Sequence, residues 1–236
     1  MSIQFINKGG EDINNYFDVQ LNSGTSSRPG VLEIIKTIPN KVKTKGTSLN
    51  YAFCNCINLI TIPLIDTKDV TSMTSMFSNC NSLEEIPLLD TSNVTNMNSM
   101  IRDCYNLVTI PLLDTSKVTN MSSMFYNDSK LETIPLLDTS NVTDMNSMFS
   151  SCSNLETIPL LNTSKVTNMS YMFGQCSKLS NESLNNILSM CANATLITNV
   201  NFKKLSILGI SSSQATTCQG LSNYADFIAA GWTTGY

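Results

Sequence analysis

Cysteine thiols recur at one fixed spacing in this chain, and they are the first residues that could do chemistry. A thiolate can act as a nucleophile or bind a metal ion, but it needs a positive and partly exposed setting. The chain has no histidine, the commonest general base and metal ligand. One column, in which equivalent positions lie 24 residues apart, holds Cys56, Cys80, Cys104, Asp128, Cys152 and Cys176. We expect a ladder of small buried thiols. Disulfides between neighbouring copies stay open, because they need Cα atoms within about 7 Å.

Methionine pairs share the same period. The pairs are Met73/Met76, Met97/Met100, Met121/Met124, Met145/Met148 and Met169/Met172. Thioethers can bind Cu(I). Each pair nevertheless has the spacing of a core-facing turn, usually with a phenylalanine beside it, so core filling is the better interpretation. The neighbouring Cys54-Asn-Cys56 is a weak metal motif without a partner pair.

Carboxylates form a third column, of Asp66, Asp90, Asp114 and Asp138, which ends in Asn162. Stacked carboxylates could hold calcium, which prefers several oxygen ligands. An Asp followed by Thr and Ser also opens a hydrogen-bonded turn. Because the column accepts Asn162, we favour the turn, and calcium remains the alternative.

The constant spacing predicts how these columns are positioned. A unit of 24 residues repeated without insertion is typical of a solenoid, in which neighbouring units stack to bury one continuous core. In the unit 155–178, Leu-x-x-Ile-x-Leu matches the strand of a leucine-rich repeat, and alternation would place Ile158 and Leu160 on one face. The apolar spacing of three and four from Val166 to Cys176 indicates a helical or 3₁₀ turn. We predict an α/β repeat solenoid, a leucine-rich-repeat ladder of about six units with non-repeating amino- and carboxyl-terminal caps.

Three segments follow from this frame. Residues 1–34 are expected to form an amino-terminal cap or attachment segment with a short strand at 16–21, and residues 35–178 the leucine-rich repeats. Residues 179–236 are expected to form a carboxyl-terminal α/β cap, since open solenoid ends need shielding. Within it we predict helices at 181–191, 213–217 and 222–230 and a strand at 205–210.

The repeat resembles a known family. The unit Leu-x-x-Ile-Pro-Leu-Leu-Asp-Thr-Ser-x-Val-Thr-Asn-Met-x-x-Met-Phe-x-x-Cys is similar to the BspA-like leucine-rich repeats of bacterial surface proteins. The stretch from Leu184 to Trp232 resembles the cap that follows such repeats in phage and prophage proteins, and Phe5–Gly10 resembles the start of phage tail-associated proteins. The resemblance implies an adhesion or recognition module and supplies no catalytic residues. Ile101 and Asp128 depart from the Phe and Cys of the pattern.

Composition excludes several classes. Hydrophobic residues make up 42% of 236, yet no apolar run approaches the roughly 18 residues of a membrane span. A net charge of −4 with scattered basic residues gives no nucleic-acid stripe. The start lacks the features of a secretory signal. We therefore expect a virion or cell-surface location without a signal peptide, cytoplasmic before assembly.

Binding residues are expected where the repeat is irregular, because the regular columns are used for packing. The candidates are Arg102, Asp103, Tyr105, Tyr126 and Tyr171. Arginine and aromatic residues on a Ser/Thr/Asn surface are typical contacts for glycans or proteins. A second candidate is the strand face, where Glu84, Glu85, Glu132 and Glu156 alternate with Thr109, Thr133 and Thr157. This acidic strip suits a cationic partner or none.

These observations favour binding over catalysis, because no acid–base pair, nucleophile set or phosphate loop is visible. We predict a non-enzymatic recognition or adhesion module, without cofactor or metal, that binds a bacterial surface protein or glycan and is associated with a phage tail. An intracellular interaction scaffold and a fragment of a bacterial adhesin are the alternatives. The amino-terminal segment could mediate homo-oligomerisation or attachment to a larger assembly.

Overall fold

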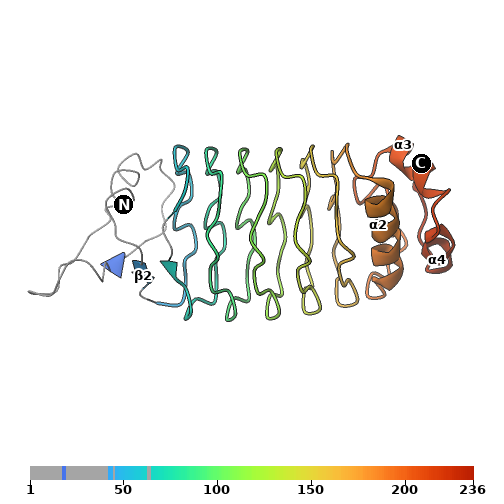
Figure 1. Cartoon of the computed structure of the whole chain (residues 1–236). Coiled ribbons are helices and arrows are strands. Elements are labelled where there is room, and N and C mark those ends of the chain that lie inside the picture. Colours follow the sequence, from blue (N-terminus) through green and yellow to red (C-terminus); the bar gives the residue numbers. More distant parts are fainter. Residues whose placement is uncertain (1–17, 20–41, 45, 63–64) are drawn as a thin grey trace, which may run out of the picture.

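The protein is a row of similar loops with a helical cap at its carboxyl-terminal end (Figure 1). This computed structural model describes residues 18–19, 42–44, 46–62 and 65–236. Each loop is 24 residues long, and we call it a rung; complete rungs are 66–89, 90–113, 114–137 and 138–161. The predicted strand at 16–21 and the first repeats from 35 lie largely outside the described residues.

A short parallel sheet joins the start of the row. Its strands β1 (Asp18–Val19), β2 (Val42–Thr44) and β3 (Ile65–Asp66) pair in that order. Beyond β3 the rungs are joined by isolated parallel bridges between equivalent positions, such as Ser72 with Asn96 and Asn120 with Asp144. Among the described rungs, the Leu-x-x-Ile-x-Leu segment that was expected to form a strand in every unit carries one such bridge, between Thr133 and Thr157.

Main-chain hydrogen bonds tie each rung to the next. The N–H groups of Met73 and Phe77 donate to the carbonyl oxygens of Asn96 (3.0 Å) and Met100 (2.8 Å). The N–H of Thr95 donates back to the carbonyl of Thr71 (2.8 Å). The same pattern repeats along the row, so neighbouring rungs lie about one strand spacing, roughly 4.8 Å, apart.

The Met-x-x-Met-Phe segment is a string of tight turns, and the prediction of a helical or 3₁₀ turn here is wrong. Two columns adopt left-handed backbone, with φ between 51° and 68°. They are Tyr51, Ser75, Ser99, Ser123, Ser147 and Tyr171, and Asn55, Asn79, Asp103, Asn127, Ser151 and Gln175. Directly after a left-handed residue, N–H groups such as those of Met76 and Cys80 bond the carbonyl three residues back. Asn and Asp are several-fold enriched in this conformation among non-glycine residues, which explains the second column.

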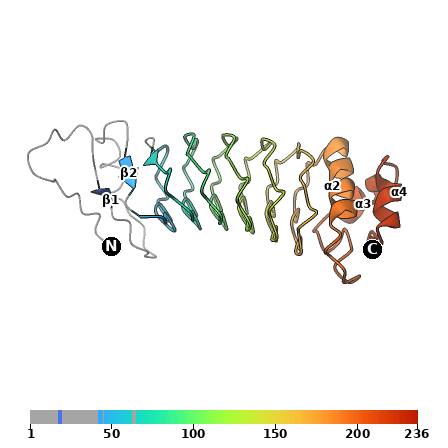
Figure 2. The same ribbon diagram turned by 90° about the horizontal axis from the view of Figure 1, so that it is seen from below.

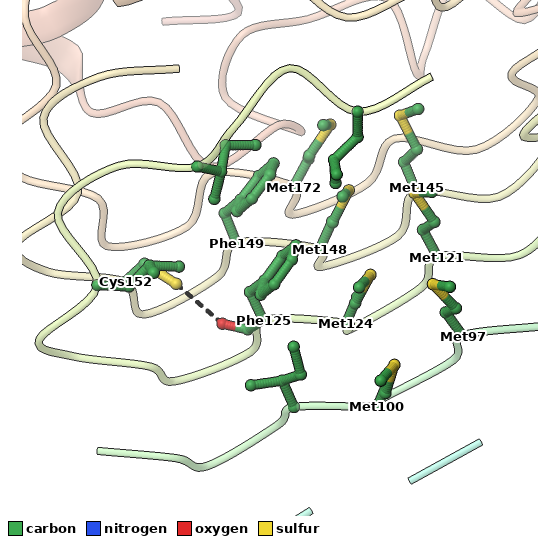
Figure 3. Close-up of a cluster of buried hydrophobic side chains, with 14 of the residues drawn as sticks. Met97, Met100, Met121, Met124, Phe125, Met145, Met148, Phe149, Cys152 and Met172 are labelled. Carbon is green, nitrogen blue, oxygen red and sulfur yellow. Dashed lines mark hydrogen bonds between the residues drawn. The ribbon is translucent and has the colours of Figure 1, made fainter. Parts of the chain in front are cut away.

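The core is a stack of identical side chains from successive rungs (Figure 3). The ten paired methionines are at most 1% exposed, which confirms core filling. Phe125 and Phe149 stack with ring centroids 5.5 Å apart and an interplanar angle of 3°. Ile101, also fully buried, interrupts this aromatic stack. Sulfur and aromatic side chains pack well in such stacks because the thioether adapts to irregular gaps.

The Ile-Pro-Leu-Leu side of each rung differs from the expected strand. Ile158 is 1% exposed, whereas Leu160 is 49% exposed and Leu161 takes the buried position. The prediction that Ile158 and Leu160 share a face is therefore wrong. The half-buried Pro159 lies between them, so strict alternation of an ideal strand is lost.

The three predicted helices of the carboxyl-terminal segment are confirmed. They are α2 (Asn181–Asn193), α3 (Ser212–Cys218) and α4 (Tyr224–Ala229). The Ser180 hydroxyl caps α2 by accepting from the N–H of Ser183, and Ser211 with Gln214 forms a capping box on α3. Helix α2 packs against both others, and all three lie at one end of the row (Figure 2).

The expected strand at 205–210 is instead a series of turns that joins the cap to the last rung. The N–H groups of Tyr171 and Phe173 donate to the carbonyls of Ile207 (2.7 Å) and Leu208 (2.9 Å), as they would to another rung. Gly209 has φ +84°, and a Cβ there would lie 2.4 Å from Cα of Gly174. Two glycines thus allow the close approach that closes the stack.

Candidate functional site

The Asp column is engaged in turns. In three rungs an Asp Oδ1 accepts the N–H of the Ser two residues later, at 2.9–3.1 Å, and Asn162 does the same for Ser164 at 3.0 Å. Hydrogen bonds from Ser92 lower the pKa of Asp90, and Ser116 acts likewise on Asp114. Within the described residues, no three Cys, Asp or Glu side chains gather into a group that could hold a metal ion.

Buried thiols occupy the Cys column. The Sγ–H of Cys152 donates to the carbonyl of Phe125 in the preceding rung at 2.9 Å (Figure 3), and Cys80, Cys104 and Cys176 make the equivalent bond. Burial raises the pKa of Cys152 well above its usual value and that of Cys176 to about 12. These thiols are therefore protonated near neutral pH and poorly suited to nucleophilic attack.

Asp128 occupies the Cys column with no exposed surface. Its Oδ1 accepts the N–H of Cys104 at 2.7 Å, and its buried Oδ2 has no hydrogen-bond partner among the residues that the structure describes. Burial raises the carboxyl pKa well above the usual value, and the nearby Asp103 adds to the rise. The pattern of the repeat could reveal this residue only as a departure from Cys.

Four of the five predicted site residues form one cluster in two neighbouring rungs. The guanidinium carbon of Arg102 lies 4.3 Å from the ring centroid of Tyr126, and its Nε donates to Oδ2 of Asp103 at 3.0 Å. Asp103 Oδ1 accepts from Nδ2 of Asn127 (2.7 Å) and from the hydroxyl of Tyr105 (3.4 Å). We call Arg102, Asp103, Tyr105, Tyr126 and Asn127 the arginine–tyrosine patch.

The patch combines a held cation with accessible aromatic surface. The side chain of Arg102 is 41% exposed, whereas that of Asp103 is 11% exposed and braces it. Tyr105 is 37% exposed. Burial, and then the Asp103 charge, raise the pKa of Tyr105, so its phenol is a neutral hydrogen-bond donor. A fixed guanidinium beside tyrosine rings can bind an acidic or hydroxyl-rich ligand without new side-chain ordering.

Tyr171 stands apart from the patch. It shares its left-handed column with Ser123, which precedes Tyr126 by three residues, and lies two rungs further along the row. It is 59% exposed. Tyr51 fills the same column at the other end of the row, and the four positions between the two tyrosines hold Ser.

The acidic strip is present as two adjacent exposed columns. Glu84 and Glu85 are both exposed, as are Glu132 and Thr133 in a later rung. A few residues later in each rung lies an exposed leucine column of Leu88, Leu112, Leu136 and Leu160. The sequence alone does not reveal this column, because Leu-Leu pairs do not show which member is buried.

A small pocket of about 260 Å³ lies where the cap meets the last rung. Its apolar lining includes Met169, Ile197 and Phe202. The sequence alone does not reveal this pocket, since the pocket depends on how the segment after α2 folds back.

The sequence of this chain matches the model of one protein family. A family model described as "Mycoplasma protein of unknown function, DUF285" matches residues 47–133 and 105–204, which together span more than half of the chain. The chain belongs to the DUF285 family. No curated protein and no solved structure matches this DUF285 chain. In the part of the chain that the structure describes, no helix is long and apolar enough to cross a membrane.

Proposed function

We propose that this DUF285 protein is a non-enzymatic recognition module that binds a bacterial surface protein or glycan through the arginine–tyrosine patch. The observation that carries the proposal is the geometry of Arg102, which is ion-paired to Asp103 and stacked on Tyr126 while its side chain stays 41% exposed. Arginine and tyrosine are the residues most often found at the centre of binding surfaces.

The rest of each rung supports this interpretation. Methionine, phenylalanine and cysteine columns are consumed by the core, and the Asp column by turns. We interpret the row as a leucine-rich-repeat-type solenoid of the BspA-like class, in which packing columns are fixed and exposed columns carry recognition. A family described from Mycoplasma is compatible with a role at a bacterial surface, and attachment to a phage tail is the second setting that we propose.

The test is binding of the labelled, purified protein to whole bacterial cells and to an array of their surface glycans. We expect saturable binding that falls at least about tenfold in Arg102→Ala and Tyr126→Ala, as for central contact residues. Tyr171→Ala is the matched control, an exposed tyrosine outside the patch, and should bind normally. Absence of binding to any cell or glycan by folded protein would overturn the proposal and favour an intracellular scaffold.

A further inference from the structure

A continuous apolar ridge runs along the row on a surface different from the patch. Its members are Leu88, Leu112, Leu136 and Leu160, which are 65%, 62%, 63% and 49% exposed. Main-chain bonds such as Glu156 N–H to Glu132 O (3.0 Å) join the rungs on this side. Successive leucines therefore stand roughly 4.8 Å apart. Scattered surface leucines are ordinary, but a contiguous row marks an interaction site.

Acidic residues flank the members of this leucine ridge along the chain. The stretch 84–90 and its equivalents 108–114, 132–138 and 156–162 hold seven carboxylates and no Lys or Arg. In the chain, glutamates precede three of the four leucines, as Glu132 precedes Leu136, and aspartates follow three of the four, as Asp138 does. Lys117 and Lys130 belong to other columns, where they donate to Asn93 and Asn106 of the preceding rung.

We propose that the leucine ridge docks a cationic amphipathic helix of a partner protein. Leucines would pack on the apolar face of that helix, and the flanking carboxylates would pair with its Lys or Arg side chains. The inference goes beyond the proposed function, because it uses columns that the arginine–tyrosine patch does not contain.

The spacing favours a helix over a strand. A helix laid along the ridge presents one apolar side chain per turn, about every 5.4 Å, close to the roughly 4.8 Å between leucines. A strand presents same-face side chains about every 6.7 Å, so its side chains would lose register with the leucines after fewer rungs. A membrane with anionic headgroups is disfavoured, since the ridge has carboxylates on both sides.

The probe is a fluorescein-labelled Leu/Lys amphipathic helical peptide of about 18 residues, titrated into the full chain and followed by anisotropy. A Leu/Glu peptide of the same apolar pattern tests charge. We expect at least about tenfold tighter binding of the Leu/Lys peptide, weakened about threefold or more between about 0.05 and 0.5 M salt.

Two variants test the ridge and its rim separately. The double variant Leu112→Ser/Leu136→Ser should lose about tenfold or more in affinity. Asp114→Asn/Asp138→Asn should lose about threefold, as removal of flanking charge predicts. Asn162 already shows that Asn keeps the turn bonds.

Controls separate this inference from the proposed function. Val200→Ser, at an exposed residue away from the ridge, should bind the peptide normally, as should Arg102→Ala. Equal affinity for the two peptides, or unchanged affinity in the double leucine variant, would overturn the proposal. Binding to anionic lipid vesicles that disappears in the same variant would also overturn it, in favour of a membrane surface.

Discussion

Asp128 is the residue at which the repeat departs furthest from its own pattern. Five other rungs place Cys at this position, and at Cys152 the thiol donates to a carbonyl of the preceding rung. The equivalent carbonyl for Asp128 belongs to Ile101, by the same offset of 27 residues. An ionised carboxylate has no proton to donate there, and burial further disfavours its charge.

We predict that Asp128→Cys stabilises the protein near pH 8 by about 1–3 kcal/mol, because it replaces a buried carboxyl with the donor used elsewhere. The pKa of Asp128 is raised in the folded state, so its contribution favours folding at low pH. That contribution declines as pH rises above the unfolded value of about 3.9 and through the raised folded value. The gain from Asp128→Cys should therefore be smaller at about pH 5, measured by urea denaturation at both pH values.

The reverse substitution is the control for Asp128. Cys152→Asp places a carboxyl in the same column of the next rung, and it should destabilise the protein more as pH rises. Equal stability of Asp128→Cys and the wild type at about pH 8 would refute this account of the buried carboxyl.

Each rung is held to the next by polar side chains as well as by main chain. The residues after the Asp column, Thr67, Thr91, Thr115, Thr139 and Thr163, are at most 1% exposed. The hydroxyl of Thr139 donates to the carbonyl of Asn162 in the next rung at 2.8 Å. The Thr91 hydroxyl is buried without a partner among the described residues. The threonine column therefore contains a matched control, because Thr91 is as buried as Thr139 but lacks its hydrogen bond.

We predict that Thr139→Val lowers the free energy of unfolding by about 1–2 kcal/mol, since it removes a buried hydrogen bond. Thr91→Val should be neutral or slightly stabilising, because no bond is lost and a polar atom leaves the core. Chemical denaturation of both variants gives the comparison. A similar loss in both would show that shape, and not the hydrogen bond, makes Thr necessary here.

At the scale of the elements, the 24-residue period predicted which side chains are buried in each rung better than it predicted the backbone conformation. Met, Phe and Cys columns and the three helices of the cap were predictable from apolar spacing and capping residues. The left-handed turns were not, because Ser75 and Asn79 would also suit an ordinary polar surface. The hydroxyl of Thr95 donates to the Thr71 carbonyl of the preceding rung (3.2 Å), whereas the side chain of the neighbouring Asn96 accepts a bond from within its own rung.

From the sequence, the candidate site was predictable only because its residues depart from the repeat pattern. Arg102, Asp103, Tyr105 and Tyr126 differ from the residues in equivalent rungs, and the structure brings them together. Tyr171 is irregular for another reason, since it lies in the rung that contacts the cap. The sequence could not separate these two cases, because both appear as a large side chain in a column of small ones.

At the scale of the whole molecule, the cap completes the hydrogen bonding of the last rung. The carbonyls of Ile207 and Leu208 replace those of a further rung, and Gly209 lies against Gly174. A stack whose units contact only neighbours depends on such an end to keep its core covered.

We predict that Gly209→Ala destabilises the protein by about 2–4 kcal/mol, because it combines a left-handed φ with overpacking. Gly220→Ala, whose Cβ would meet its nearest described neighbour at 3.7 Å, should be nearly neutral. Thermal unfolding of both variants checks the prediction. Comparable melting temperatures for the two would contradict the close approach of cap and rung.

The whole molecule is a regular scaffold that holds one irregular patch, and this claim can be tested by erasing the patch. The variant Arg102→Ser/Asp103→Asn/Tyr105→Ser/Tyr126→Ser takes every new residue from equivalent positions in other rungs. It should therefore keep its fold and melting temperature.

The most direct measurement is the affinity of this erased variant and of the wild type for the same bacterial cells, by a saturation assay with labelled protein. The account predicts saturable binding by the wild type and a loss of about a hundredfold or more in the folded variant, as expected when several central contacts are removed. Equal binding by both proteins would contradict the assignment of recognition to the patch.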